Sequence, residues 1–234
     1  MTDLVFASAT GVVPLSVIRR LGVRRMNLRV DAREGAVKLT LPRFAPLGPA
    51  LRWVEEKRGW VEAQLERMPQ PRPIMPGMLV PFGDRQLRLD WQPSHPRKPQ
   101  IVGETIRIGG PAEGLEARTL RWLRQAALAR LREETEQIAA RGGIIVPSVA
   151  VGDPKSRWGS CSSSGAIRYS WRLHLAPAFV LKATVAHEVA HRVHMNHGPA
   201  FHALVAELLG ADPKPARHWL RTHGQSLHGF GRAY

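Results

Sequence analysis

The segment 186–198 contains the pattern His187-Glu188-x-x-His191, in which residue types and spacing together indicate a chemistry. On a helix of about 3.6 residues per turn, residues four apart lie on one face, so His187 and His191 can direct two imidazoles at one point. Neutral imidazole is a good zinc ligand, and two of them supply half of a tetrahedral site. Glu188, about 100° further around the helix, can act as a base toward a water at the metal. The pattern therefore predicts metal-assisted hydrolysis.

A third protein ligand must come from another position, and three histidines are candidates. On a continuing helix His194 would stand in one row with the first two, about 10 Å from His187 along the axis, where a tetrahedral arrangement cannot form. His197 lies in the run 196–199 (Asn-His-Gly-Pro), whose residue types favour a turn back over the metal. We favour His197, with His202 in the next helix as the alternative. Three histidines would leave one position open, as in a catalytic zinc site.

Composition limits the class of protein. The chain has 234 residues, 44% of them hydrophobic, which is enough for a sizeable core and argues against disorder. No apolar run reaches the roughly 18–20 residues that span a bilayer, and the N-terminal segment is a poor signal peptide. With Cys161 alone there is no internal disulfide, which favours the cytoplasm. Cys161 could act as a thiolate ligand, although a small buried thiol is the simpler interpretation.

The chain is strongly basic. It carries 34 Lys and Arg against 19 Asp and Glu, a net charge of +15. Such a balance favours anionic partners and leaves open contact with nucleic acid through a basic surface. The charges are spread along the whole chain, however, so a solvated surface is the competing interpretation. We expect no membrane partner, and the sequence does not indicate an oligomeric state.

The first half of the chain reads as mostly β structure. Apolar and polar residues alternate in 12–18, 26–30 and 36–41, with a turn at 31–35, and again in 78–82, 86–91 and 105–108, with an exposed loop at 93–100. Between these groups, 49–68 has a helical period. Trp53 and Trp60 lie seven apart on its apolar stripe and are interpreted as core anchors, not as a stacking pair for bases. We predict a β-rich region 1–110 with one Trp-containing helix.

The second half predicts the elements that position the metal site. A long amphipathic helix should cover 113–141 and end at Gly142-Gly143. Strands are expected at 144–151, 156–162 and 166–175, and a helix starting near Pro177 should hold the metal motif. Further helices should begin at Pro199 and at Asp212-Pro213. We predict that 111–234 forms the metal-binding region and that the fold class is α+β.

Further motifs surround the histidines at specific spacings. These motifs are Arg157-Trp158-Gly159-Ser160-Cys161-Ser162, Trp171-Arg172-Leu173, Pro177, and His187-Glu188-x-x-His191-x5-His197-x3-Phe201. In combination they resemble the YgjP-like metal-dependent hydrolases, which are related to the SprT-like zinc metallopeptidases. The resemblance covers nearly the whole chain and departs at His202, where the family commonly has Trp. It implies a zincin-type core with a small sheet packed on the metal helix. It also implies one catalytic Zn²⁺ held by His187, His191 and His197, with Glu188 as base.

Three functions follow from these observations. The first is a zinc-dependent hydrolase of metallopeptidase type, acting on a peptide or protein. The second is a metal-dependent nucleotide (NTP) pyrophosphohydrolase, which the basic charge also fits. The third is a DNA-associated accessory module, although such a module would not need the intact Glu188. The strand containing Trp158 to Cys161 is expected beside the metal helix, where it either lines the substrate cleft or fills the core.

Overall fold

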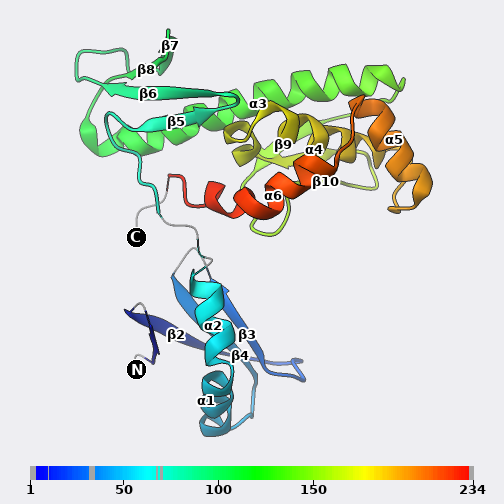
Figure 1. Ribbon diagram of the computed structural model, residues 1–234. Coiled ribbons are helices and arrows are strands. Elements are labelled where there is room, and N and C mark those ends of the chain that lie inside the picture. Colours follow the sequence, from blue (N-terminus) through cyan, green and yellow to red (C-terminus); the bar gives the residue numbers. More distant parts are fainter. Residues whose placement is uncertain (1–3, 10, 32–34, 67, 69–70, 232–234) are drawn as a thin grey trace. The chain divides into compact units, whose positions relative to one another are not determined.

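The structure is a computed structural model that describes residues 4–9, 11–31, 35–66, 68 and 71–231 (Figure 1). Its contacts divide the chain into two compact units, Met1–Gln70 and Pro71–Ala233. The turn expected at 31–35 falls largely on 32–34, outside the described residues. Among the residues described, no helix is both long and apolar enough to cross a membrane.

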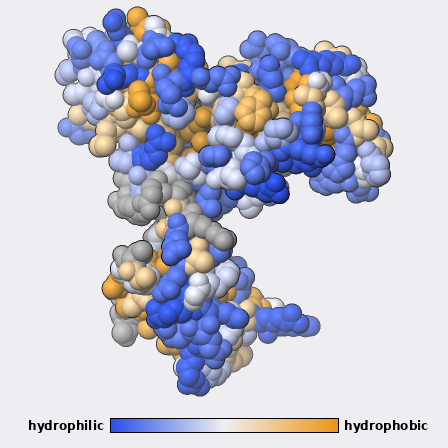
Figure 2. Space-filling model, in the orientation of Figure 1, coloured by the Kyte–Doolittle hydropathy of each residue, from blue (hydrophilic) through white to orange (hydrophobic). Residues whose placement is uncertain are grey.

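The N-terminal unit packs helices on one sheet. Its strands, in the order β1-β2-β4-β3, are β1 (Val5–Ser8), β2 (Gly11–Arg20), β4 (Ala36–Pro42) and β3 (Asn27–Asp31). Strands β2 and β4 run parallel, and the other pairs run antiparallel. The alternation expected in 36–41 holds, since Val37, Leu39 and Leu41 are fully buried and share a core with residues of the helices. Hydrophilic residues form most of the surface of this unit that is visible in Figure 2.

The single helix predicted for 49–68 is two helices, α1 (Leu47–Glu56) and α2 (Arg58–Glu66). Lys57 separates them with φ −93° and ψ 10°. Trp53 packs against the core, as expected, whereas Trp60 is 44% exposed, so its interpretation as a core anchor was wrong. Because the helix is interrupted, a spacing of seven residues no longer places the two rings on one face.

The C-terminal unit begins with a second sheet and a long helix. The sheet has the order β5-β6-β8-β7, with β5 (Leu79–Phe82), β6 (Arg85–Trp91), β8 (Thr105–Ile108) and β7 (Gln100–Val102). Strand β7 was not expected, because its short sequence adjoins the polar loop. Helix α3 (Leu115–Arg141) buries Leu123, Ala127 and Leu131 at intervals of four residues, and Gly142 ends it as predicted.

The β5–β6 hairpin belongs to the same unit as the helix that carries His187 and Glu188, which is called the metal helix here for its predicted role. The Gly83 N–H donates to the His174 carbonyl oxygen at 2.9 Å. The Asp84 carboxylate accepts from the Ala178 N–H at 2.8 Å, at the start of the metal helix. Phe82 stacks on Trp122 of α3, with centroids 5.6 Å apart. The contacts therefore place the boundary near residue 70, whereas the sequence-based boundary was 110/111. The hairpin packs against residues far away in the sequence, and its own residue pattern gives no indication of these contacts.

The remaining elements surround the histidine motif. A small sheet of order β10-β11-β9 comprises β10 (Gly159–Cys161), β11 (Ile167–Ser170) and β9 (Val149–Gly152). It is followed by the 3₁₀ turn η2 (Trp171–Leu175) and by helices α4 (Ala178–Ala190), α5 (Pro199–Leu209) and α6 (Lys214–Leu227). Helix α4 contacts α3, α5, α6 and β10. The α+β fold class predicted from the sequence is confirmed.

The strand expected over 166–175 is only partly a strand. It ends at Ser170, whose hydroxyl accepts from the Arg172 N–H at 3.4 Å and starts η2. The buried Arg172 guanidinium then donates to Asp153, at 2.7 and 3.1 Å. It also donates to the carbonyl oxygens of Leu227 and Phe230, at 2.6 and 2.8 Å. Apolar and polar residues still alternate in 171–175, but these hydrogen bonds direct the chain toward α4.

Candidate metal centre and substrate pocket

Helix α4 brings the motif into the core. Most of its side chains are apolar and buried on all sides, which explains why a 13-residue helix is stable at this position. His187 lies in its last turn, and His191 is the C-cap residue. The helix therefore ends before His194, and the row of three histidines that a continuing helix would produce does not form. The chain turns through 192–198, and Pro199 starts α5 at its N-terminus.

The turn brings His197 back to the helical pair. Each of His187, His191 and His197 offers a ring nitrogen, and these nitrogens lie within 4.8 Å of one another. The Nε2 atoms of His187 and His197 are 3.2 Å apart. Two nitrogens bound tetrahedrally at about 2.0–2.1 Å would be separated by roughly 3.3 Å. The spacing of this pair therefore fits ligation of one metal ion.

The orientation of His191 also suits a metal ligand. Its Nδ1 lies 3.1 Å from the His194 carbonyl oxygen, which can only accept, so Nδ1 carries the proton and Nε2 keeps its lone pair. His194 thus supports the cluster through its backbone. Among the described residues neither the His194 ring nor Cys161 joins the cluster. His202 also lies outside it, with its centroid 6.4 Å from that of His197.

Burial keeps His187 and His191 neutral. It is the first cause that lowers the pKa of His187 to about 4, and the charges of His191, His197 and Arg217 add to the effect. Burial likewise lowers the pKa of His191. A neutral imidazole has a free lone pair, so both rings are in the form that binds a cation near neutral pH.

Glu188 is buried beside the cluster. Glu188 is only 5% exposed. Burial raises the pKa of its carboxyl to about 7, and the charge of Arg157 partly opposes this rise. The carboxyl group packs against the backbone of β10. A Cβ atom added to Gly159 would lie 2.4 Å from Oε1 of Glu188. A base whose pKa is close to neutral can both accept and return a proton.

Strand β10 presents a free edge next to Glu188. The Trp158 carbonyl accepts from the Ser170 N–H at 2.8 Å, and the Ser162 N–H donates to the Ala166 carbonyl at 3.0 Å. Directly opposed residues in an antiparallel pair alternate between hydrogen-bonded and non-hydrogen-bonded. Since Trp158 and Ser162 are bonded to the neighbouring strand, Gly159 and Cys161 are at non-bonded positions and direct their backbone N–H and C=O groups away from β11. That direction is the open edge of the sheet, because the strand order is β10-β11-β9.

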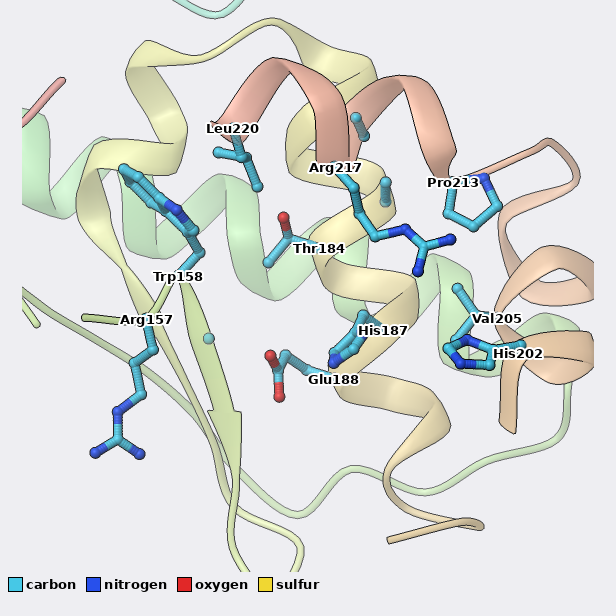
Figure 3. Close-up of a pocket in the computed structure, with 13 residues that line it drawn as sticks. Arg157, Trp158, Thr184, His187, Glu188, His202, Val205, Pro213, Arg217 and Leu220 are labelled. Atoms are coloured by element: carbon cyan, nitrogen blue, oxygen red, sulfur yellow. The ribbon is translucent and has the colours of Figure 1, made fainter. Parts of the chain in front are cut away.

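A cavity of about 280 Å³ adjoins Glu188 and His187 (Figure 3). Figure 3 shows both side chains projecting from α4, Trp158 closing one end, and Arg217 extending from α6 toward the end where Val205 and His202 lie. The lining residues are Arg157, Trp158, Gly159, Ala183, Thr184, His187, Glu188, His202, Val205, Pro213, Ala216, Arg217 and Leu220. The motif therefore opens onto a pocket and is not sealed in the core.

Sequence reasoning did not single out three residues that line this pocket, Thr184, Ala216 and Arg217. Thr184 lies three residues before His187, on the same helical face, so spacing could have identified it. Helix α6 contains Lys214, Arg217 and Arg221 but no acidic residue, which was a signal of a cationic wall. Nothing in the sequence indicated that this wall would face α4.

Metal-dependent hydrolases are the class of protein that this site fits, because three histidine nitrogens lie close together beside a buried carboxyl and an accessible pocket. Residues 24–223 match the family model described as YgjP-like, metallopeptidase domain, and the chain belongs to that family. The sequence-based recognition of this family is thereby confirmed. Comparison with curated proteins and with solved structures gave no match.

Proposed function

We propose that this protein is a zinc-dependent metallopeptidase in which His187, His191 and His197 bind the metal and Glu188 is the base. The observation that carries the proposal is the convergence of three histidine nitrogens within 4.8 Å, next to a carboxyl that is 5% exposed. Nitrogen ligands favour zinc over the hard cations Ca²⁺ and Mg²⁺, which prefer oxygen. Three histidines are also the ligand set of a catalytic zinc site with an open position.

The residues of the proposed site have different roles in the hydrolysis. Bound zinc supplies Lewis acidity, which lowers the pKa of a coordinated water to about 7 and polarises a carbonyl. Glu188 takes a proton from the attacking water as its oxygen bonds to the scissile carbon. When the C–N bond breaks, Glu188 passes this proton to the leaving amine. The His194 carbonyl holds the His191 ring in the orientation that keeps Nε2 available.

The edge of β10 favours a peptide as substrate. An extended peptide can add to a free strand edge through backbone hydrogen bonds. The outward backbone groups of Gly159 and Cys161 offer such bonds, and Gly159 lies directly against the Glu188 carboxyl. A peptide paired there would place its backbone beside the base.

The nucleotide pyrophosphohydrolase alternative is favoured by a different observation. Arg157 and Arg217 both line the pocket, and Glu188 is its single acidic lining residue among those described. Such a lining attracts anions, including phosphate groups. A DNA-associated role is supported only by the charge of +15 and stays a prediction from the sequence.

The test compares two substrate classes with one pair of variants. The zinc-loaded wild type is assayed on an unfolded protein and on a panel of nucleoside triphosphates. Glu188→Gln should abolish hydrolysis while zinc stays bound, and Glu207→Gln, an exposed acid on α5, serves as the matched control. Cleavage of protein that depends on Glu188 supports the peptidase. Release of pyrophosphate from nucleotides without peptide cleavage would replace it with the alternative.

Metal content gives an independent readout. His187→Ala should lose the zinc that the purified wild type retains. If the metal content of this variant equals that of the wild type, the proposed site is wrong, whatever the protein hydrolyses.

A further inference from the structure

The pocket beside Glu188 has a mostly apolar lining. Residues from three helices and from the segment before β10 contribute to it, chiefly Trp158, Val205, Ala216 and Leu220. The Trp158 ring is held in place, since a Cβ atom on Gly224 would lie 2.8 Å from its Cζ2 atom and the His228 ring lies 5.1 Å from it, centroid to centroid. A pocket closed by a fixed indole ring and aliphatic side chains favours an apolar occupant.

Its size corresponds to one side chain. A cavity of about 150 Å³ holds a benzene molecule, and the volume here is about 280 Å³. A large aliphatic or aromatic side chain therefore fits. Among the polar groups of the lining, the Thr184 hydroxyl already uses its proton in a hydrogen bond to the Val180 carbonyl oxygen, at 2.9 Å. The larger apolar share of the lining therefore favours an apolar side chain as the occupant.

Arg217 provides a positive charge at one end of this pocket. Arg217 is exposed, and within the described residues its guanidinium has no side-chain hydrogen bond or ion pair. No acidic residue on α6 could pair with it. Asp212, on the preceding loop, accepts from the Lys214 N–H at 2.9 Å instead. Arg217 extends toward the end of the pocket where His187, Val205 and His202 lie, as Figure 3 shows.

The apolar lining and Arg217 belong to the same pocket, which adjoins the proposed reacting centre. A scissile carbonyl held near the histidine cluster would place the side chain of one flanking residue in the apolar pocket, beside Glu188. A negative group on that residue or on the next would then come within reach of Arg217. Arginine binds carboxylates with a planar pair of donors, so a carboxylate is a suitable counterpart.

We propose that this pocket is the specificity subsite of the peptidase, that it receives a bulky apolar side chain flanking the scissile bond, and that Arg217 binds a carboxylate of the same substrate segment. The inference rests on the proposed function and adds the substrate class: peptides in which a large apolar residue adjoins a carboxylate. The carboxylate can come from the peptide C-terminus or from an acidic side chain, and the experiment separates these two sources.

The experiment uses the zinc-loaded full chain and matched fluorogenic peptides. One set varies a single position from Ala to Leu to Phe. A second set places Glu or Gln next to the Phe residue, and a third compares a free C-terminus with an amide. For the wild type we expect kcat/KM to be about tenfold or more higher with Phe than with Ala, and with carboxylate than with its neutral counterpart.

Variants then assign these preferences to residues. Arg217→Gln should remove the carboxylate preference by raising KM about tenfold or more, while leaving the Phe-over-Ala preference. Arg217→Lys should keep part of it. Ala216→Leu, which extends into the cavity, should reduce cleavage of Phe peptides but spare Ala peptides. Arg221→Gln is the matched control, because Arg221 is exposed on the same helix and does not line this pocket.

The outcomes separate this inference from the proposed function. Peptide cleavage that depends on Glu188 but is unaffected in selectivity by Arg217→Gln and Ala216→Leu overturns the subsite and keeps the peptidase. If no peptide is cleaved in a Glu188-dependent manner, both proposals fail. Nucleotide hydrolysis that is lost in Arg217→Gln, without any peptide cleavage, assigns Arg217 to phosphate and likewise overturns the inference. Zinc content and thermal unfolding of each variant establish that it is folded.

Discussion

The backbone of Gly159 lies so close to the carboxyl group of Glu188 that a side chain at residue 159 would have to displace it. A Cβ atom at residue 159 would lie 2.4 Å from Oε1, 2.6 Å from Cγ and 2.7 Å from Cδ of Glu188. Glu188 belongs to the metal helix and Gly159 to the edge strand of the small sheet. Glycine at this position thus allows the base and the free strand edge to occupy adjacent space.

Gly159→Ala should therefore impair hydrolysis without removing the metal. The added methyl group displaces the Glu188 carboxyl, and a displacement of about 1 Å in a reacting group can lower the rate about 100-fold. Overpacking should also lower the free energy of unfolding by about 1–3 kcal/mol. The measurements are kcat/KM, zinc content and urea unfolding, with Ser160→Ala as the control. Unchanged kcat/KM would show that the Glu188 position does not matter for the reaction.

The third ligand can be identified by comparing three histidines in one experiment. His197→Ala should weaken zinc binding by more than the about 10–100-fold that loss of an outer hydrogen-bond partner costs. His194→Ala should have little effect, because His194 contacts the cluster through its carbonyl oxygen. His202→Ala should retain the metal as well. Competition with a chelator measures all three affinities. Loss of zinc from His202→Ala with retention in His197→Ala would reverse the assignment.

Arg172 is expected to be a major determinant of stability. It is 3% exposed and joins η2 to Asp153 and to the end of α6 through charged and carbonyl contacts. Arg172→Gln would remove the charged contact with Asp153 and would take this donor from the carbonyl oxygens of Leu227 and Phe230, so the free energy of unfolding should fall by about 3–5 kcal/mol. Thermal or urea unfolding measures this loss, and Arg168→Gln, an exposed residue on the neighbouring strand, is the control. A difference below about 1 kcal/mol between the two variants would contradict the expected role.

His174 should make stability depend on pH. Both of its ring nitrogens are buried without a hydrogen-bond partner among the described residues, and burial lowers its pKa from 6.5 to about 4. Between these values the unfolded state binds more protons than the folded state, so stability rises with pH from about 4 to 6.5. A shift of this size corresponds to roughly 3.4 kcal/mol.

The variant His174→Leu should lack this part of the pH dependence. Urea unfolding at pH 4.5, 5.5, 6.5 and 7.5 in the presence of a chelator measures it for both proteins. Because His187 and His191 titrate in both, their contribution cancels in the difference. If the difference in free energy is constant over this range, His174 is not the titrating group.

Much of the site could be predicted because it depends on local spacing. His187 and His191 lie on one helical face through a separation of four residues. The chain turns before Pro199 as predicted, although neither Asn196 nor Gly198 uses the left-handed backbone that its residue type allows, since Gly198 is extended with φ −78°. The apolar character of α4 and the glycines after α3 likewise predicted elements that the structure contains. Where a local hydrogen bond competed with the pattern, as at Ser170, the prediction of a longer strand was wrong, and the single helix predicted for 49–68 is interrupted at Lys57.

The sequence by itself determined the spacing of His187 and His191, the acidic residue Glu188 between them and most of the succession of helices and strands. These follow from backbone periods of two and 3.6 residues, which neighbouring side chains encode. Only the tertiary structure decided that Gly159 lies against Glu188, that Arg217 lines the pocket, and that the β5–β6 hairpin joins the unit of the metal helix. These contacts connect residues tens of positions apart, and their formation depends on how the whole core packs, which no local pattern records.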